Sequence, residues 1–185
     1  LILDDVRCGL RLAFGGSWEP IGVKPDLSAW SKAIANGYPL AALLGNDRVR
    51  DAASKIYATG SFWFSAVPMA AALATLDVLE KDDGVARMQQ AGEALMTGMR
   101  QQAASLGLRV NVTGHPTMPY LKFADETEWH WTTVFAAECA RLGLYTHPRH
   151  NWFISTAITE DLVATILSIT ERAFTVAKKA GAGSR

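Results

Sequence analysis

The chain has 185 residues, of which 49% are hydrophobic and 19% are charged. Its 18 basic and 18 acidic side chains balance, so no charge excess favours DNA, RNA or an anionic membrane as a partner. These proportions are typical of a globular protein with a buried core, and no apolar run is long enough to predict a membrane span. Cys8 and Cys139 stand far apart, which predicts free thiols and a cytoplasmic location.

The first half of the sequence alternates short apolar segments with turns. Because the opening Leu-Ile-Leu-Asp is typical of a central strand with neighbours on both sides, we expect the chain to be the carboxy-terminal piece of a longer protein. The predicted strands are residues 1–3, 27–31, 40–44 (buried) and 56–59. The predicted helices are residues 47–54, with Asp47 as N-cap, and residues 65–80, which we expect to be well buried.

The second half contains longer helical patterns and a paired set of strands. Glycine and proline between residues 112 and 117 predict a turn that joins two antiparallel strands. Gly143 is a C-cap signal for one helix, and Thr159 is an N-cap signal for another. The predicted helices are residues 83–106, 128–142 and 159–178, and the predicted strands are residues 108–112, 117–123, 144–146 and 152–156.

The change of pattern predicts two domains. Residues 1–80 are typical of the later half of a large domain with a mixed or parallel sheet, and residues 81–179 are typical of a small α+β domain. Residues 180–185 are expected to form a flexible tail. The fold class predicted for the whole chain is α/β.

Two side chains stand at predicted strand ends, where open α/β sheets bind their ligands. Asp4 ends the first strand, and Lys32 follows the second. Pyridoxal phosphate needs an amine to hold it as a Schiff base and a carboxylate to keep its pyridine nitrogen protonated. Taken alone, this pair also fits a surface lysine and a helix-capping aspartate, which is the commoner case, so the pattern leaves both readings open.

Four blocks of sequence, in order, make the pattern more specific. They are Leu3-Asp4-Asp5-Val6, Gly9-Leu10-Arg11, Gly22-Val23-Lys24-Pro25-Asp26-Leu27 and Ser31-Lys32-Ala33-Ile34-Ala35-Asn36-Gly37-Tyr38-Pro39. Together they resemble the class III pyridoxal-phosphate-dependent aminotransferases, in the branch that contains glutamate-1-semialdehyde 2,1-aminomutase. The resemblance implies the fold type I of that family, with a small carboxy-terminal domain.

The resemblance also implies roles for three residues. Lys32 matches the lysine that forms the Schiff base, and Asp4 matches the carboxylate beside the pyridine nitrogen. Ser61 matches the hydroxyl residue that reaches the cofactor phosphate of a neighbouring subunit, which implies a homodimer with its active site at the interface. Asp5 stands where the family has glutamate, so contacts near the substrate are expected to be looser. Ser61 also fits a simple turn cap, and that alternative stays open.

The loop at residues 147–150 carries further polar side chains. Arg149 fits a substrate carboxylate, although a solvated arginine in a loop is the commoner case. His147 and His150 lack a third ligand at a suitable spacing, so no metal site is predicted.

Three functions follow from these observations. The first is transfer of an amino group between an amine or amino acid and a keto acid or aldehyde, with Lys32 as the catalytic residue. The second is an aminomutase that moves the amino group within one molecule. The third is a non-catalytic fragment, because the half of the family fold that holds the cofactor phosphate is expected to precede Leu1.

Overall fold

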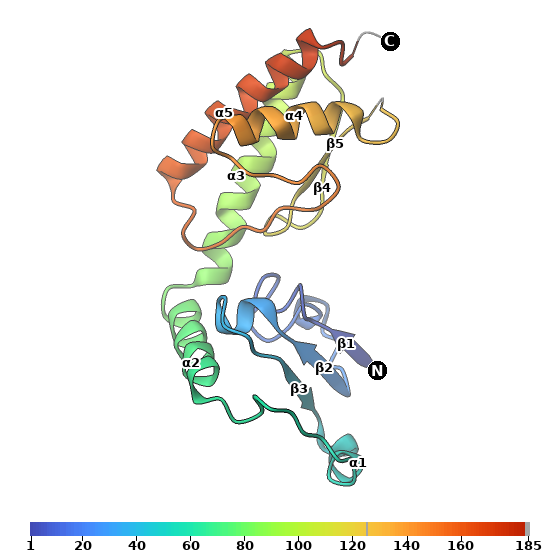
Figure 1. Cartoon of the computed structure of the whole chain (residues 1–185), viewed down its shortest axis with the longest axis vertical. Coiled ribbons are helices and arrows are strands. Elements are labelled where there is room, and N and C mark those ends of the chain that lie inside the picture. Colours follow the sequence, from blue (N-terminus) through green and yellow to red (C-terminus); the bar gives the residue numbers. More distant parts are fainter. Residues whose placement is uncertain (125, 184–185) are drawn as a thin grey trace. The chain divides into compact units, whose positions relative to one another are not determined.

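The computed structural model describes residues 1–124 and 126–183. The chain divides into two compact units, Leu1–Val85 and Ala86–Arg185, and the sequence predicted a division after residue 80. Figure 1 shows a small sheet with α2 in the first unit, and helices α3, α4 and α5 with a strand pair in the second. Helices and strands occur in both units, as the α/β prediction requires.

The first unit is built on a three-stranded sheet. Its strands are β1 (Ile2–Asp4), β2 (Leu27–Trp30) and β3 (Ala42–Gly45), in that order. β1 runs parallel to β2 with Asp4 opposite Ala29, and β3 runs antiparallel to β2. Since parallel strands end at the same edge of a sheet, the residues that follow β1 and β2 emerge together at one edge.

The two faces of this sheet differ in burial. Leu3 and Trp30 are each 7% exposed, whereas Ile2 and Leu43 are 71% and 64% exposed. Because successive side chains of a strand point to opposite faces, Asp4 shares the open face of Ile2. The sheet therefore presents a carboxylate on its open face at the end of β1.

Three predictions for the first unit were wrong in detail. The third strand is an exposed edge rather than buried, because among the described residues β3 pairs with β2 and with no other strand. The predicted helix at 47–54 is a short 3-10 turn, Asp47–Val49, followed by one turn of helix α1 (Arg50–Ala53). Its cap is Asn46, whose side chain accepts the N–H of Arg48. Residues 56–59 form no strand, because no neighbouring strand of the described residues lies there to pair with them.

Helix α2 (Ala66–Lys81) covers the predicted residues but is much less buried than expected. It contacts the 3-10 helix Lys32–Ala35, and its buried residues are Pro68 and Ala72. Its larger apolar side chains, by contrast, include Val67 and Leu73, which are 62% and 65% exposed. The helix is apolar all round, so one packed face leaves much hydrophobic surface open.

The second unit packs three helices with an antiparallel strand pair. The helices are α3 (Gly84–Ser105), α4 (His130–Arg141) and α5 (Glu160–Lys179), and the strands are β4 (Val110–Thr113) and β5 (Tyr120–Phe123). The predicted N-cap of α5 is confirmed, because Thr159 Oγ1 accepts the N–H of Leu162. Gly143 adopts the left-handed backbone, with φ +93°, just after α4, which confirms the C-cap signal.

The core of the second unit is an aromatic cluster with small and aliphatic side chains around it. The rings of Phe135 and Phe174 lie 4.7 Å apart, and Phe123 meets both of them edge-on. Cys139, on α4, is fully buried, and its burial raises the pKa of the thiol to about 12. The core therefore joins β5, α4 and α5.

Two short strands predicted for the second unit are absent from its described residues. Residues 144–146 and 152–156 are irregular, although the N–H groups of Trp152 and Ile154 donate to the carbonyls of Pro119 and Thr117. These two bonds align residues 152–154 with residues 117–119, but they do not form a regular ladder of strand hydrogen bonds.

The tail predicted at residues 180–185 is ordered where the structure describes it. Ala182 is only 3% exposed, and its N–H donates to the carbonyl of Ala177. Residues 184–185 lie outside the described part of the chain. No helix among the described residues is long and apolar enough to cross a membrane.

Candidate active site

Asp4 is fixed at the carboxyl end of β1. Its carboxylate accepts the N–H of Val6 at 3.1 Å, a local bond that orients the side chain just after the strand. The residue is exposed on the open face of the sheet. An anionic group is therefore held in one orientation where a ligand can reach it.

Lys32 follows the neighbouring strand and has an unusual backbone. It opens the 3-10 helix Lys32–Ala35 with φ +51°, in the left-handed region. That conformation costs an ordinary side chain about 1–2 kcal/mol. Lys32 is exposed, and strained backbone of this kind is common at functional sites.

The structure brings Asp4 and Lys32 to one edge of the sheet. β1 and β2 are parallel neighbours, and Asp4 is paired with Ala29, three residues before Lys32. The sequence prediction that both stand at strand ends is therefore confirmed. A carboxylate and a primary amine at one sheet edge form the donor set that an aldehyde-bearing pyridine needs.

Ser61 does not lie at the carboxyl end of β1 or β2, as Asp4 and Lys32 do, but comes later in the chain. It is exposed, in a turn between α1 and α2, and the N–H of Trp63 donates to the carbonyl of Gly60 within that turn. Among the described residues, Ser61 makes no hydrogen bond to Asp4 or Lys32. Its role at a neighbouring subunit's phosphate remains a prediction.

Asp5 has a different role from the one expected. It is 1% exposed, on the same buried face of the sheet as Leu3 and Trp30, so it does not face the side of Asp4. Its Oδ2 accepts the N–H of Ser17 at 3.0 Å. A Cβ on Gly16, where φ is +129°, would lie 3.1 Å from that oxygen, so glycine lets the loop approach closely.

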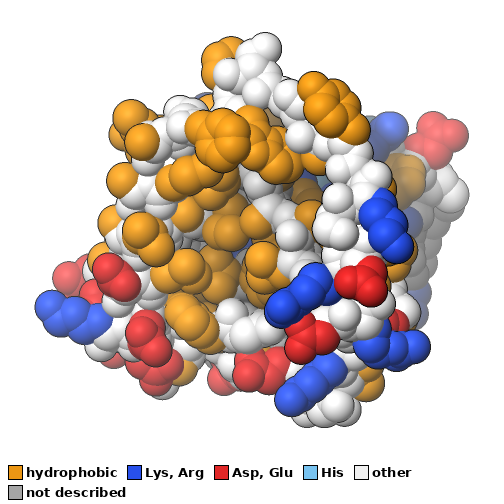
Figure 2. Space-filling view, turned by 90° about the horizontal axis from the view of Figure 1, so that it is seen from below, with side chains coloured by type: hydrophobic (Ala, Val, Ile, Leu, Met, Phe, Trp, Pro, Cys, Tyr) orange, Lys and Arg blue, Asp and Glu red, His pale blue; other side chains and the backbone are white. Residues whose placement is uncertain are grey.

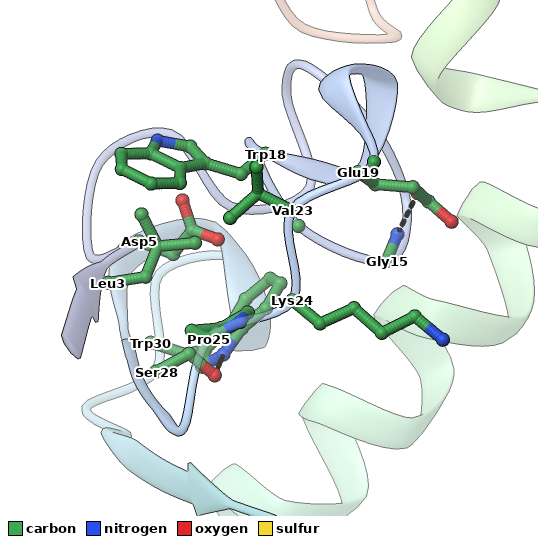
Figure 3. Close-up of a pocket in the computed structure, with 12 residues that line it drawn as sticks. Leu3, Asp5, Gly15, Trp18, Glu19, Val23, Lys24, Pro25, Ser28 and Trp30 are labelled. Atoms are coloured by element: carbon green, nitrogen blue, oxygen red, sulfur yellow. Dashed lines mark hydrogen bonds between the residues drawn. The ribbon is translucent and has the colours of Figure 1, made fainter. Parts of the chain in front are cut away.

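A pocket of about 260 Å³ lies over this buried face. Figure 3 shows the indole of Trp18 and the side chains of Leu3, Asp5 and Trp30 around it, with Lys24 at the rim. The Trp30 Nε1–H donates to Ser28 Oγ at 2.8 Å. Asp4, Lys32 and Ser61 do not line this pocket. Sequence reasoning missed it, although the period-two alternation of both strands could have assigned Asp5 and Trp30 to one face.

Cys8 lies near this pocket's carboxylate and is a poor nucleophile. Burial raises the pKa of its thiol, and the charge of Asp5 adds to that effect. The protonated thiol is the unreactive form. The exposed amine of Lys32 therefore remains the candidate for chemistry in the first unit.

Arg149 of the second unit stacks on an aromatic side chain. Its guanidinium lies 5.0 Å from the centre of the Trp129 ring, and Lys122 Nζ lies 4.9 Å from the same ring. The indole N–H donates to the hydroxyl of Tyr120, which in turn donates to the carbonyl of Pro148. The arginine is exposed, and these contacts hold its loop against β5.

Comparison with known proteins agrees with this geometry. The family model of class III aminotransferases matches residues 1–174. The chain belongs to the class III aminotransferase family.

Two curated relatives show the range of that family. The chain is 47% identical to an aminopentol aminotransferase of Sphingopyxis macrogoltabida over 174 residues, which are 94% of the chain and 41% of the relative. It is 31% identical to a glutamate-1-semialdehyde 2,1-aminomutase of Myxococcus xanthus over 98% of the chain and 46% of the relative. The chain thus spans less than half the length of these relatives.

Solved structures share the fold. The FumI protein of Sphingopyxis sp. MTA144, solved in its PLP internal aldimine form, is 44% identical with a TM-score of 0.93, over 98% of this chain and 44% of that one. An omega-transaminase from Sphaerobacter thermophilus, 23% identical, superposes with a TM-score of 0.85 over 96% of this chain and 44% of that one. The fold is therefore that of the PLP-dependent transaminases, fold type I, as the sequence predicted.

Proposed function

We propose that the whole protein is a pyridoxal-phosphate-dependent aminotransferase. It would transfer an amino group between an amine or amino acid and a keto acid or aldehyde. The observation that carries this proposal is the placement of Asp4 and Lys32 after adjacent parallel strands, in a chain that the class III family model matches over residues 1–174.

The residues present fit the cofactor. Lys32 offers an exposed primary amine, to which the cofactor's aldehyde carbon would bind covalently. Asp4 offers an exposed carboxylate, already oriented by the N–H of Val6, for the pyridine nitrogen. When bound, pyridoxal phosphate supplies the electron sink that stabilises negative charge on the substrate carbon.

Two side chains of the first unit would do the remaining work. The carboxylate of Asp4 would hold the ring nitrogen through a charge-assisted hydrogen bond. The ε-amine of Lys32 would move a proton to and from the substrate carbon as a general base and acid. Both roles need the open face of the sheet to be reachable by small molecules.

A homodimer with its active site at the interface belongs to the same proposal. Phe62, Trp63 and Phe64 follow Ser61 and are 87%, 53% and 85% exposed. Figure 2 shows hydrophobic side chains gathered around a hollow on the face that it presents. Exposed apolar patches of this kind mark protein contacts. In such a dimer Ser61 would donate its hydroxyl to the cofactor phosphate of the neighbouring subunit.

The decisive experiment removes the amine of Lys32 from the whole protein. Incubation with pyridoxal phosphate, reduction with borohydride and peptide mass spectrometry should find the cofactor on Lys32. In Lys32→Ala that adduct should be lost and transamination should fall about a thousandfold or more. Lys55→Ala, which changes an exposed lysine of the same unit, is the control and should retain both. An active-site adduct that persists in Lys32→Ala would contradict the proposal.

The substrate is part of the proposal at the level of class. The 47% identical relative is an aminopentol aminotransferase, so aminopentol is the first amino donor to assay, with pyruvate and 2-oxoglutarate as acceptors. A protein that uses none of these donor and acceptor pairs would need a wider screen of amines.

An aminomutase is the second candidate, because a 31% identical relative has that activity by name. Asp4 and Lys32 would serve both reactions. The two differ in their need for an acceptor: an aminomutase loaded with the amine form of the cofactor converts one substrate without any keto acid. A strict requirement for a keto acid excludes it.

A non-catalytic role for the 185-residue chain is the third candidate. This candidate is supported by the length of the match, since the chain spans 41% of the aminopentol aminotransferase. Pyridoxal phosphate titrated into the chain alone tests it. Tight binding with one cofactor per chain would exclude this candidate.

We also place the protein in the cytoplasm, a proposal supported by its two free cysteines and testable by cell fractionation.

A further inference from the structure

Lys32 stands where the regular alternation of β2 ends. Asp4 is paired with Ala29, so Leu27 and Ala29 share the open face, and Ser28 and Trp30 share the buried one. A strand that continued through residues 31 and 32 would place Lys32 on the buried face of Trp30. Lys32 is instead exposed, because the chain leaves the strand at Ser31.

The backbone change at this point is abrupt. Ser31 is fully extended, with φ −164° and ψ −157°, and Lys32 then takes φ +51°. A left-handed lysine persists only where the surrounding structure fixes it. The fold must therefore supply contacts that hold the Ser31–Lys32 backbone.

One side-chain bond closes the loop that contains Lys32. The hydroxyl of Ser31 donates to the carbonyl of Leu40 at 2.8 Å, and this bond is half-buried. It spans the segment from the end of β2 to the start of β3, where Trp30 pairs with Ala42. Inside that segment, the N–H groups of Ile34, Asn36 and Tyr38 donate to carbonyls within the loop, and Ala35 is fully buried.

From this geometry we infer that Ser31 is a positioning residue for Lys32: its hydroxyl, bonded to the carbonyl of Leu40, holds the left-handed backbone that keeps the lysine amine on the open side of the sheet. The inference rests on the proposed function, in which that amine binds the cofactor. Ser31 itself does not touch the reacting atoms in this account.

The test compares three variants of the whole protein. Ser31→Ala removes the hydroxyl, and Ser31→Thr keeps it. Ser54→Ala is the matched control, because the Ser54 hydroxyl also donates to a backbone carbonyl at 2.8 Å, that of Asp51, away from Lys32.

Two measurements are made on each variant. The first is the rate at which cofactor-free protein captures pyridoxal phosphate on Lys32, followed by borohydride quenching and mass spectrometry. The second is hydrogen exchange at the amides of Ile34, Asn36 and Tyr38 without cofactor. Loss of one neutral hydrogen bond predicts about fivefold slower capture and about fivefold faster exchange in Ser31→Ala. Ser31→Thr should lie within about twofold of wild type, and Ser54→Ala should change neither measurement.

The outcomes separate this inference from the proposed function. Unchanged capture in Ser31→Ala, with Lys32 still modified in wild type, overturns the inference and leaves the function standing. Capture as slow in Ser31→Thr as in Ser31→Ala overturns it too, since the hydroxyl would then not matter. If wild type never carries the cofactor on Lys32, the proposed function fails. Unchanged amide exchange in Ser31→Ala would then overturn the inference on its own.

Discussion

At the scale of single residues, Asp4 and Lys32 could be predicted from the sequence because both follow apolar runs that end at one edge of a parallel pair. The left-handed backbone of Lys32 could not, since lysine, unlike glycine, asparagine or aspartate, gives no signal for it. The burial of Asp5 was missed because a carboxylate next to Asp4 was expected to face the substrate. Its bond to the N–H of Ser17 depends on the loop that crosses the sheet, which local patterns do not predict.

His115 should make the second unit sensitive to acid. Its Nδ1 accepts the N–H of Thr117 at 3.3 Å and lies 2.9 Å from the Thr117 hydroxyl, so the neutral ring fits this turn. Burial lowers the pKa of His115, and the charge of Glu93 opposes that shift. A lowered folded-state pKa means that the ring's contribution to stability is complete above pH 6.5. That contribution is lost as the pH falls towards and through the folded pKa.

The measurement is urea unfolding between pH 7.5 and pH 4.5. Wild type should lose more free energy of unfolding over this range than His115→Asn, in which a neutral acceptor cannot take up a proton. His147→Asn, which changes an exposed histidine, should follow wild type. Parallel curves for wild type and His115→Asn would show that His115 does not cause the sensitivity.

At the scale of elements, helices were predicted better than short strands. The cap of α5 was read correctly because Thr159 acts within three residues of its own position. Residues 56–59 and 144–146 were predicted as strands from four or three apolar or β-branched positions, but a strand exists only where another strand pairs with it. That partner is a property of the tertiary fold, so local sequence could not exclude it.

Helix α3 depends on a glycine where the β4–β5 turn crosses it. A Cβ on Gly92 would lie 1.9 Å from the carbonyl oxygen of Pro116, which is rigid backbone. Gly92→Ala should therefore destabilise the protein by about 2 kcal/mol through overpacking, although alanine favours a helix by nearly 1 kcal/mol over glycine.

Gly98→Ala in the same helix is the matched control. Its Cβ would meet Cδ2 of Leu167 at 2.6 Å, the far end of a flexible side chain that can move. This change should alter stability much less than Gly92→Ala. Equal thermal unfolding midpoints for the two variants would mean that the backbone of the turn at Pro116 moves to accommodate the added Cβ at little energetic cost.

At the scale of the whole molecule, the family followed from the order of the sequence blocks. The exposure of α2 did not. An apolar helix was taken to be buried, and the packing surface for its remaining faces is not provided by the sheet of its own unit. Hydrophobicity predicts that a surface is buried, but it does not say whether the same polypeptide or another one buries it.

The aromatic run should contribute to association of the whole protein. Replacement of Phe62 and Phe64 by serine should weaken the proposed homodimer at least tenfold, because burial of each ring contributes roughly 1.5–3 kcal/mol. Sedimentation velocity over a range of concentrations measures this, with Tyr145→Ser as control, since Tyr145 is an 82% exposed aromatic of the second unit. An unchanged dissociation constant would show that the run lies outside the interface, and a wild type that is monomeric throughout would contradict the dimer.

The rate at which the buried thiol of Cys139 is alkylated should report how often the second unit opens. A fully buried side chain whose pKa is raised to about 12 presents almost no thiolate to an alkylating reagent while the unit is closed. The rate of its modification is then set by how often α4 separates from the aromatic core rather than by the chemistry of sulfur. Cys8 in the other unit is only partly buried, so its modification does not require the second unit to open, and the two thiols report on the two units separately.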